Sequence, residues 1–427
     1  MPERLTVLSL EQATTLPYLT CRLAQEGARV IRVENPPRGD PNRWVGPDVL
    51  GEPGMNAYFL PNNAGKQAIT LNLASERGRA ILHELIVRLD VDVFATNQRP
   101  KDYARLGIDY ETLRAIRPDL IWLGITGFGP DSNEAAYDPI LQARAGWMDL
   151  NRAPPSPPSP LTTDDQRTTE GRGGPSSVPR PPSAYGSEGL PLAFGLPLVD
   201  LGAAEHAYGQ VMRALYLRAT TGQGTRIDLS MFRSAVSWLV SPIMLQASFG
   251  IPTVHRGNRH PFFAPVDVFP TVGGHIYLAV GNDRQWEALT RLPGFEALAE
   301  ARYRTNAGRA EDAEALCQRL AAITCRMPRD DLVRALRKAG VPVAQVSPIA
   351  AVLDDPALHG ERVRARDPRT GVEIVLPPPP VTPPHLVASG WQMSFPPRLG
   401  EHNAAIYGDL LGYDAAELER LRQEGII

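Results

Sequence analysis

The sequence is poor in several residue types, and each shortage excludes a class of protein. Its three cysteines, Cys21, Cys317 and Cys325, are odd in number and far apart, which predicts reduced thiols in the cytoplasm instead of a disulfide framework. Cys-x-x-Cys and His-Glu-x-x-His spacings are absent, so no metal site is expected. The net charge of −3 gives no basis for binding nucleic acid or an anionic membrane.

Further absences concern membranes and nucleotides. We expect no signal peptide, because Arg4 interrupts the N-terminus and residues 5–10 indicate a buried strand. Residues 234–254 carry no charge, but they contain several polar residues and break at Pro252, which favours a helix buried in the protein or in a subunit interface over a membrane span. The glycines form no Gly-x-Gly-x-x-Gly fingerprint, so binding of NAD or FAD is not indicated.

The sequence does contain a regular alternation of apolar strands with helical patterns. Such alternation predicts an open, parallel α/β sheet, which binds ligands at the carboxyl ends of its strands. Asn97, Arg99 and the glycine turn at 127–129 follow such strand ends. The predicted strands are residues 5–10, 28–34, 68–73, 91–96, 120–126 and 226–230, and the helices among them are 19–25, 74–89 and 110–116.

Asp200 lies at another predicted junction between a strand and a helix. The apolar pair Leu198-Val199 predicts the end of a short strand, and a helical pattern runs from Ala203 to Tyr216. One interpretation is that Asp200 caps the helix, because an aspartate there satisfies free backbone N–H groups. The other is that its carboxylate is a nucleophile at the positive end of the helix. The local sequence leaves both interpretations open.

Seven short motifs, in their order and spacing, resemble the class III CoA-transferases, the family of the formyl-CoA:oxalate and carnitine CoA-transferases. The same superfamily contains the α-methylacyl-CoA racemases. The chain departs from the family pattern at Leu16-Pro17, where Gly-Pro is usual, and in a longer loop at 152–188. The motifs span nearly the whole chain and are Gly27–Glu34, Asn63–Leu73, Ile125–Gly129, Tyr137–Ile140, Thr221–Gly224, Gly257–Pro261 and Leu399–His402.

The resemblance implies which residues bind CoA. Asn97 and Arg105 match positions that contact CoA in the family, and Leu71 lies in a segment that holds the adenine end. Arg38 lies in a loop that often carries a basic residue for a CoA phosphate. Arg99, at the same strand end as Asn97, is expected to join them.

The resemblance also implies a mechanism, because Asp200 matches the family's catalytic aspartate. Attack of its carboxylate on an acyl-CoA gives a mixed anhydride and the CoA thiolate, and return of the thiolate gives an aspartyl-CoA thioester. A small carboxylic acid acceptor then reverses these steps. Coenzyme A and acyl-CoA are therefore substrates, and no prosthetic group or metal is expected. Backbone N–H groups at the turn before the Asp200 helix are expected to hold the developing oxyanion.

Tyr137 bears on the alternative function, that of an α-methylacyl-CoA racemase or epimerase. The resemblance places it where the racemases carry a histidine base. A tyrosine, with a reference pKa of about 10, is a poor base near neutral pH but a good hydrogen-bond donor to a thioester or anhydride oxygen. The sequence therefore predicts a CoA-transferase with Asp200 and Tyr137 as catalytic residues, and it leaves the donor and the acceptor open.

The resemblance further implies a two-domain chain in an interlocked homodimer, and a hetero-oligomer with a paralogous chain stays open. The Pro, Ser, Thr and Gly content of residues 152–188 predicts a flexible insertion in the large domain. No nucleic acid or membrane partner is expected. The expected parts are a large CoA-binding domain with a Rossmann-like sheet at 1–225, a linker helix at 226–255, a smaller α+β domain at 256–346, an extended Pro-rich linker at 347–398, and a tail at 399–427 that returns to the large domain.

Overall fold

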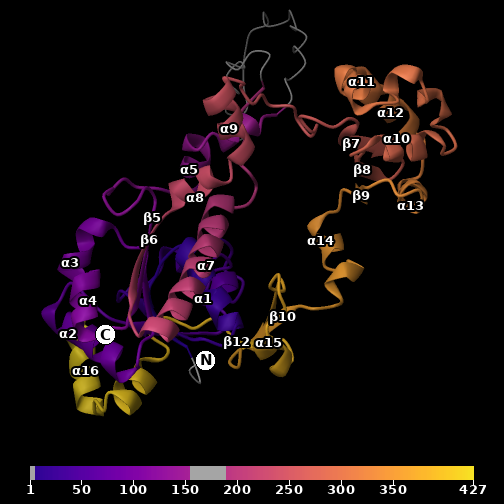
Figure 1. Ribbon diagram of the computed structural model, residues 1–427. Helices are drawn as coiled ribbons and strands as arrows, with labels where there is room; N and C mark the ends of the chain where they lie inside the picture. The colour runs from indigo at the N-terminus through magenta and orange to yellow at the C-terminus, as the bar shows by residue number, and fades with distance from the viewer. Residues whose placement is uncertain (1–4, 154–188) are drawn as a thin grey trace, which may run out of the picture. The chain divides into compact units, whose positions relative to one another are not determined.

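The computed structural model describes residues 5–153 and 189–427, so almost all of the predicted insertion at 152–188 lies outside the described residues. The chain divides into two compact units. The first comprises 1–147, 193–251 and 360–427, and the second comprises 148–192 and 252–359 (Figure 1). The domain boundaries expected from the sequence stay a prediction.

The first unit is built on a sheet of six parallel strands in the order β3-β2-β1-β4-β5-β6. This confirms the predicted parallel α/β sheet. The order of the strands along the chain reverses between the neighbours β1 and β4, and ligands bind at such a point in sheets of this kind. The strands are β1 (Thr6–Leu10), β2 (Arg29–Glu34), β3 (Lys66–Thr70), β4 (Val93–Thr96), β5 (Ile121–Thr126) and β6 (Thr225–Ser230).

Helices cover both faces of this sheet. Alternate strand residues point to opposite sides, and the apolar side chains on both sides are buried by helices. Leu8 packs with the helices drawn on one side of the sheet in Figure 1, α2, α4 and α16, whereas its neighbour Val7 packs with α1, α7 and α8 on the other. The helices of this unit are α1 (Thr15–Gln25), α2 (Glu76–Arg88), α3 (Tyr103–Leu106), α4 (Tyr110–Ile116), α5 (Asp138–Arg144), α7 (Leu198–Thr221), α8 (Met231–Ser237), α9 (Val240–Phe249), α15 (Pro384–Ala388), a π-helix at Ala404–Leu410 and α16 (Ala415–Gln423); α6 (Trp147–Leu150) spans the boundary with the second unit.

A buried cluster of charges holds the start of α1. The Lys66 ammonium donates to Glu11 Oε1 at 2.7 Å and to the carbonyl oxygen of Pro17 at 2.8 Å. Burial alone would raise the pKa of Glu11, but the charges of Lys66 and Arg32 hold it below its usual value. Glu11 accepts a further hydrogen bond of 2.6 Å from Thr20, within α1. The cluster therefore ties the end of β1 to the first turns of α1.

The remaining sheets are small. In the second unit β7 (Val266–Thr271), β8 (Gly274–Ala279) and β9 (Val343–Gln345) form an antiparallel sheet in that order. In the first unit β10 (Val363–Arg366) lies between β11 (Glu373–Leu376) and β12 (Gln392–Ser394). The helices of the second unit are α10 (Asp283–Thr290), α11 (Asn306–Glu311), α12 (Ala313–Thr324), α13 (Arg329–Lys338) and α14 (Ile349–Val352).

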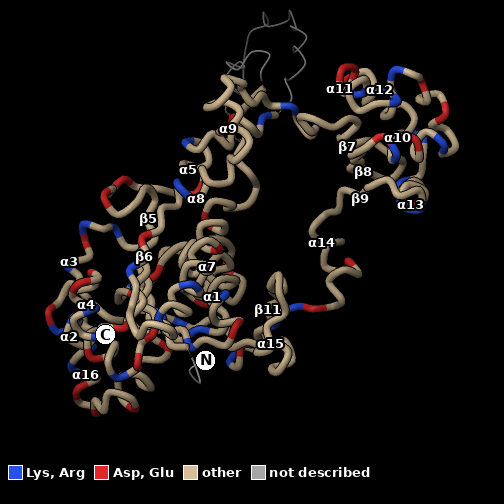
Figure 2. The backbone as a smooth tube through the Cα atoms, in the orientation of Figure 1, with Lys and Arg blue, Asp and Glu red and all other residues tan. Residues whose placement is uncertain are grey.

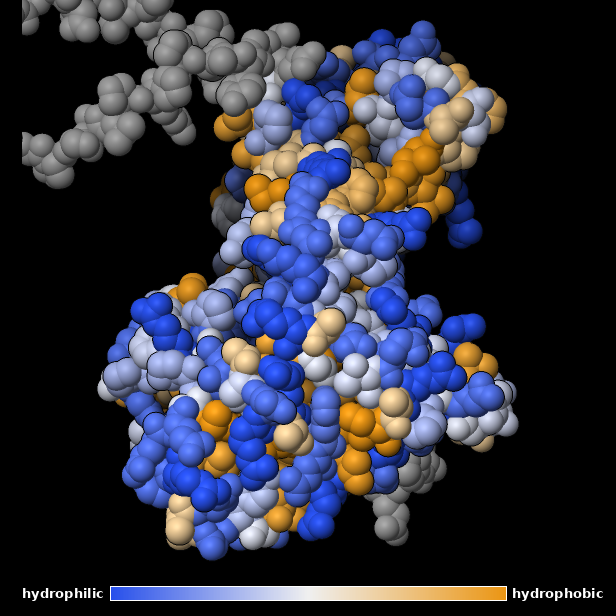
Figure 3. All heavy atoms as spheres, turned by 90° about the vertical axis from the view of Figure 1, so that its left-hand side faces the viewer, coloured by the Kyte–Doolittle hydropathy of each residue, from blue (hydrophilic) through white to orange (hydrophobic). Residues whose placement is uncertain are grey.

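The surface of the first unit carries two features relevant to partners. Helices α2 and α16 each carry both acidic and basic residues (Figure 2). Residues 226–255, expected as one linker helix, form β6 and then two helices, and α9 has no buried residue. Figure 3 shows hydrophobic side chains interspersed with hydrophilic ones on the face that it draws. Within the described residues, none of the helices combines the length and the hydropathy needed to cross a membrane.

Candidate active site

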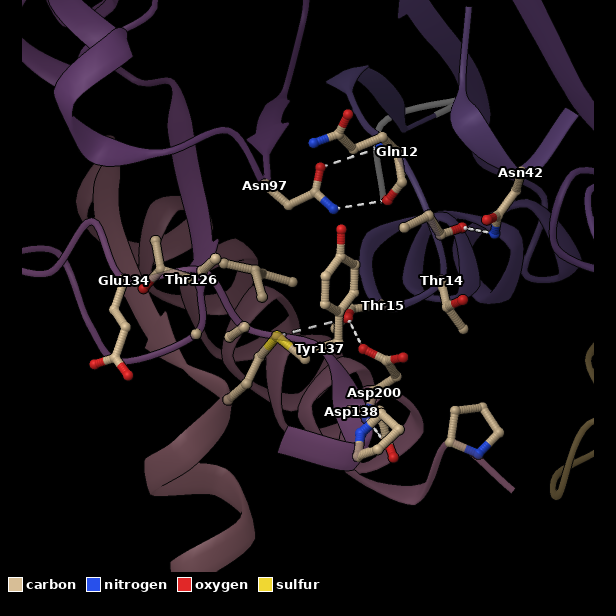
Figure 4. A pocket seen from close by; sticks show the side chains of 18 of the residues that line it. Gln12, Thr14, Thr15, Asn42, Asn97, Thr126, Glu134, Tyr137, Asp138 and Asp200 are labelled. Atoms are coloured by element: carbon tan, nitrogen blue, oxygen red, sulfur yellow. Dashed lines mark hydrogen bonds between the residues drawn. The ribbon is translucent and has the colours of Figure 1, made fainter. Parts of the chain in front are cut away.

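A cavity of about 500 Å³ opens at the carboxyl ends of β1, β4 and β5, in the first unit. Its lining comes from the loops after these strands, from the start of α5 and from the first turn of α7 (Figure 4). It therefore lies at the carboxyl ends of the strands, where the sequence predicts ligand binding, and beside the reversal of strand order between β1 and β4. Asn97, Arg99, Tyr137 and Asp200 line this one cavity.

Asp200 lies inside a helix, not before one. Helix α7 begins at Leu198 after Pro197, so the predicted strand end at Leu198-Val199 is wrong, and Asp200 is not the N-cap residue. Two apolar residues are too short a run to distinguish a strand from the first turn of a helix. Val199 is fully buried among residues of the sheet and α1, which fixes the rotation of this turn.

The carboxylate of Asp138 caps α7 from outside the helix. Its Oδ2 accepts the backbone N–H of Val199 at 2.7 Å and that of Asp200 at 3.0 Å. The remaining free N–H group of this turn, that of Leu198, donates to the carbonyl of Leu196, and the N–H of Leu201 makes the first hydrogen bond of the helix, to the carbonyl of Pro197. The N–H groups that the sequence analysis expected to hold an oxyanion are therefore occupied, and that expectation is corrected.

The side chain of Asp200 meets the start of α1. The hydroxyl of Thr15, the first residue of α1, donates a hydrogen bond to Asp200 Oδ1 (Figure 4). Helix α7 packs against α1, and its small buried residues Ala203, Ala204 and Ala207 belong to the same buried cluster as Leu16 of α1. Burial raises the pKa of Asp200 to about 6, the hydrogen bond from Thr15 opposes this shift, and the charge of Asp138 adds to it.

The loop between β1 and α1 is held in an unusual conformation. Ala13 has a φ of 63°, a left-handed conformation that is uncommon for a residue with a side chain. Asn97 pairs with the backbone of Gln12 in both directions, at 3.1 and 2.8 Å. The N–H of Ala13 donates to Asp40, and its carbonyl accepts from Asn42. Asn97, predicted as a CoA contact, thus also shapes the loop that carries Thr15.

Tyr137 and Arg99 leave their side chains accessible at the cavity. Tyr137 is 72% exposed, occupies the N-cap position of α5 and projects its ring into the cavity (Figure 4). Arg99 is exposed at the end of the β4 loop. A phenol and a guanidinium both donate hydrogen bonds, so this side of the cavity can bind an anionic or carbonyl-bearing ligand.

Three predicted CoA contacts lie outside the cavity lining. Arg38 and Arg105 are exposed, and Arg105 pairs with Asp102 at 2.8 Å. The side chain of Leu71 is buried in the core between the sheet and α2, so only its backbone is available to a ligand. Their roles in CoA binding stay predictions.

The model for CoA-transferase family III matches residues 3–403. The chain belongs to this family. It is accordingly an enzyme of this class, and the resemblance of its motifs is confirmed. It is 30% identical to a succinate–glutarate CoA-transferase of Agrobacterium fabrum over 95% of this chain and 94% of that one. It is 33% identical to an acetyl-CoA:oxalate CoA-transferase of Acetobacter aceti, over 82% of each chain.

The fold matches that of two solved proteins. A CaiB/BaiF family protein from Brucella suis has a TM-score of 0.75 with 31% sequence identity, over 96% of this chain and 99% of that one. A protein from Mycobacterium tuberculosis has a TM-score of 0.72 at 24% identity, over 94% of this chain and 98% of that one, which shows the likeness of the fold alone.

The sequence did not predict the roles of two residues of this candidate site, Thr15 and Asp138. Thr15 carries no motif, and its role depends on α1 packing against α7. Asp138 had a sequence signal, since Asp-Pro at 138–139 is a common helix start, but its contact is with a helix 62 residues later. Within the described part of the chain, we find no group of three His, Cys, Asp or Glu side chains that could hold a metal ion.

Proposed function

We propose that this chain transfers CoA from an acyl-CoA donor to a small carboxylic acid, with Asp200 as the covalent nucleophile. The observation that carries the proposal is the position of Asp200: its carboxylate lies in the cavity at the reversal of strand order and is neither paired with a cation nor used as a helix cap among the described residues. With a pKa of about 6, it is ionised at neutral pH and retains more basicity than an ordinary aspartate.

The proposed reaction has four steps. An Asp200 oxygen attacks the thioester carbon of the donor and expels the CoA thiolate, which leaves a mixed anhydride. The thiolate attacks the Asp200 carbonyl carbon and expels the donor acid, which leaves an aspartyl-CoA thioester. The acceptor carboxylate attacks the same carbon and expels the thiolate again. The thiolate then attacks the acceptor's carbonyl carbon, which releases the new acyl-CoA and restores the Asp200 carboxylate.

The side chains at and beyond the cavity supply the contacts for the substrates. Tyr137 is proposed to donate its phenol hydrogen to the thioester or anhydride oxygen. Asn97 and Arg99 are proposed to bind CoA at the cavity. Arg38 and Arg105, both exposed, are proposed to pair with its phosphates, and the backbone at Leu71 to contact the adenine.

The relatives indicate the class of acceptor. Their names give succinate and glutarate in one case and oxalate in another, all small dicarboxylic acids. We propose a small dicarboxylic acid as the acceptor and succinyl-CoA as a donor for this chain also.

We further propose that the chain works as an interlocked homodimer in the cytoplasm. Several large apolar side chains of α9 and its neighbours are exposed, and neighbouring exposed apolar side chains are typical of a protein interface. The exposed residues include Trp238, Val240, Ile243, Met244, Phe249 and Ile251.

A substrate screen tests the proposed function. The wild-type protein is incubated with succinyl-CoA or acetyl-CoA and with glutarate, oxalate or mesaconate, and new acyl-CoA is measured by liquid chromatography. We expect new acyl-CoA to form with at least one pair. The matched variant Asp200→Asn, which preserves size and hydrogen bonding, is expected to form none. Transfer at the wild-type rate by Asp200→Asn would overturn the proposal.

A further inference from the structure

The proposed reaction places negative charge on Asp200 itself. In the second and third steps, a nucleophile attacks the Asp200 carbonyl carbon, and charge develops on the Asp200 oxygen that stays bonded as the carbonyl oxygen. A hydrogen-bond donor held at that oxygen in advance would stabilise this charge. The backbone N–H groups of the first turn of α7 are engaged with Asp138, Leu196 and Pro197, so this donor must come from another element.

We propose that Thr15 is a catalytic residue whose hydroxyl donates to the carbonyl oxygen of the Asp200 anhydride and thioester and stabilises the charge that develops there. This inference rests on the proposed function of Asp200. The hydroxyl already donates to Asp200 Oδ1 in the free protein, which leaves Oδ2 as the oxygen that attacks the donor.

The surroundings hold Thr15 in this position. Its side chain is buried, with only 4% of the residue exposed, and the Met231 sulphur lies 3.7 Å from its hydroxyl oxygen. Lys66 fixes the same turn of α1 by donating to the Pro17 carbonyl at 2.8 Å. Because α1 also packs along α7, the hydroxyl needs no reorganisation when charge appears on Oδ1.

The role divides the four steps into two classes. Steps one and four occur at the substrate's carbonyl carbon, where Thr15 has no part. Steps two and three occur at the Asp200 carbonyl carbon, where the hydroxyl lowers the barrier. Loss of the hydroxyl is therefore expected to slow formation of the aspartyl-CoA thioester after the anhydride has formed.

The test compares Thr15→Val, which has nearly the same shape without the donor, with Thr15→Ser, which keeps the hydroxyl. Each full-length protein is mixed with succinyl-CoA without an acceptor, quenched at intervals and examined by intact mass spectrometry for the CoA adduct. Removal of one oxyanion donor costs about 100-fold in rate, so we expect this slowing in Thr15→Val and near wild-type rates in Thr15→Ser. Thr290→Val is the matched control, because among the described residues the Thr290 hydroxyl bonds only to carbonyls of its own helix, α10.

A pH profile separates this role from a structural one. The hydrogen bond from Thr15 lowers the pKa of Asp200, so Thr15→Val is expected to move the acidic limb of the transfer rate to higher pH, and Thr15→Ser to restore it. Asp138 is the other titratable group that acts on Asp200, and it is unchanged in both variants. If Thr15→Val does not fold, Thr15→Ala takes its place with the same expected results.

The outcomes distinguish this inference from the function on which it rests. The role of Thr15 alone would be overturned by the following result: the wild-type protein forms the CoA adduct, and Thr15→Val forms it at the same rate with an unshifted pH profile of transfer. Absence of any CoA adduct on the wild-type protein, together with absence of transfer, would overturn the proposed function itself.

Discussion

The backbone N–H of Asp200 donates a hydrogen bond of 3.0 Å to the carboxylate of Asp138, so that one aspartate orients the other. The same carboxylate oxygen accepts the N–H of Val199 at 2.7 Å, and the second oxygen accepts from the Gln142 amide. Gln142 in turn accepts the N–H of Phe194 at 2.9 Å. The start of α5 thereby holds both the first turn of α7 and the segment that leads into it.

Two substitutions of Asp138 are expected to distinguish the effect of its charge on the pKa of Asp200 from the effect of its hydrogen bonds on stability. The charge raises the pKa of Asp200, so Asp138→Asn, which keeps an acceptor oxygen, should move the acidic limb of the rate to lower pH. This direction is opposite to that expected for Thr15→Val. Asp138→Ala also removes the cap and should cost about 0.5–2 kcal/mol of stability and lower kcat. The pH–rate profile and the Tm are measured for both variants. An unchanged kcat in Asp138→Ala would contradict the expected loss of activity.

Neutralisation of Asp200 is expected to stabilise the fold at neutral pH. Burial raises its pKa from 3.8 to about 6, which means that the folded state disfavours the charged form. The resulting loss of stability is absent below pH 3.8, grows between pH 3.8 and about 6, and is complete above that range. Asp200→Asn should therefore melt at a higher temperature than the wild type at pH 8, with a smaller difference at pH 5. An equal Tm at pH 8 would contradict the raised pKa.

The buried pair of Glu11 and Lys66 is expected to be essential for the start of α1. Lys66→Met leaves Glu11 buried with only Arg32 nearby, at 3.7 Å, and removal of one partner of a buried pair costs about 3–5 kcal/mol. The double variant Glu11→Gln with Lys66→Met removes both charges and should recover part of this loss. Urea unfolding of the single and double variants measures the difference, and a double variant less stable than Lys66→Met would be the contrary result.

Tyr137 is expected to assist transfer without supplying a base. Tyr137→Phe should slow transfer about 10-fold, the kinetic equivalent of one neutral hydrogen bond, because Asp200 remains. Because a racemase must remove and return an α-proton and a tyrosine is a poor base near neutral pH, we also expect no racemase activity. Incubation with a 2-methylacyl-CoA in deuterated water should therefore leave the α-carbon unlabelled. Deuterium there at rates comparable with turnover would favour the racemase.

The sequence predicted the sheet well because buried parallel strands are short, apolar and bounded by turns. Helix α4 was predicted as residues 110–116, as found, and β5 within one residue. Strand β3 ends earlier than predicted, at Thr70, because the residues after it turn toward the C-terminus, where the N–H of Asn72 meets the carbonyl of Ile426. Such pairing with a distant segment leaves no local pattern.

The sequence predicted only part of the candidate site, because the other part depends on contacts between residues far apart in the sequence. Asp200 was predicted from its place before a helical pattern and from the family resemblance, Tyr137 from the resemblance, and Asn97 and Arg99 from their place after a strand. The hydrogen bond from Thr15 to Asp200 joins residues that are 185 positions apart in the sequence. The hydrogen bond from the Asp200 N–H to Asp138 joins residues that are 62 positions apart. They arise from the packing of α1 and α5 against α7, which periodicity does not encode. The start of α7 was misplaced because its cap comes from Asp138 and not from the preceding residue.

The central claim is that Asp200 exchanges a carboxylate oxygen with the substrates. In the third step an oxygen of the acceptor becomes the bridging oxygen of the anhydride, and the fourth step leaves it on Asp200. The enzyme is therefore turned over with succinyl-CoA and an acceptor acid labelled with ¹⁸O in its carboxylates, then digested and examined by mass spectrometry. We predict heavy oxygen in the peptide that contains Asp200, and none in the same peptide when the acceptor is omitted. An unlabelled Asp200 after many measured turnovers would contradict the account.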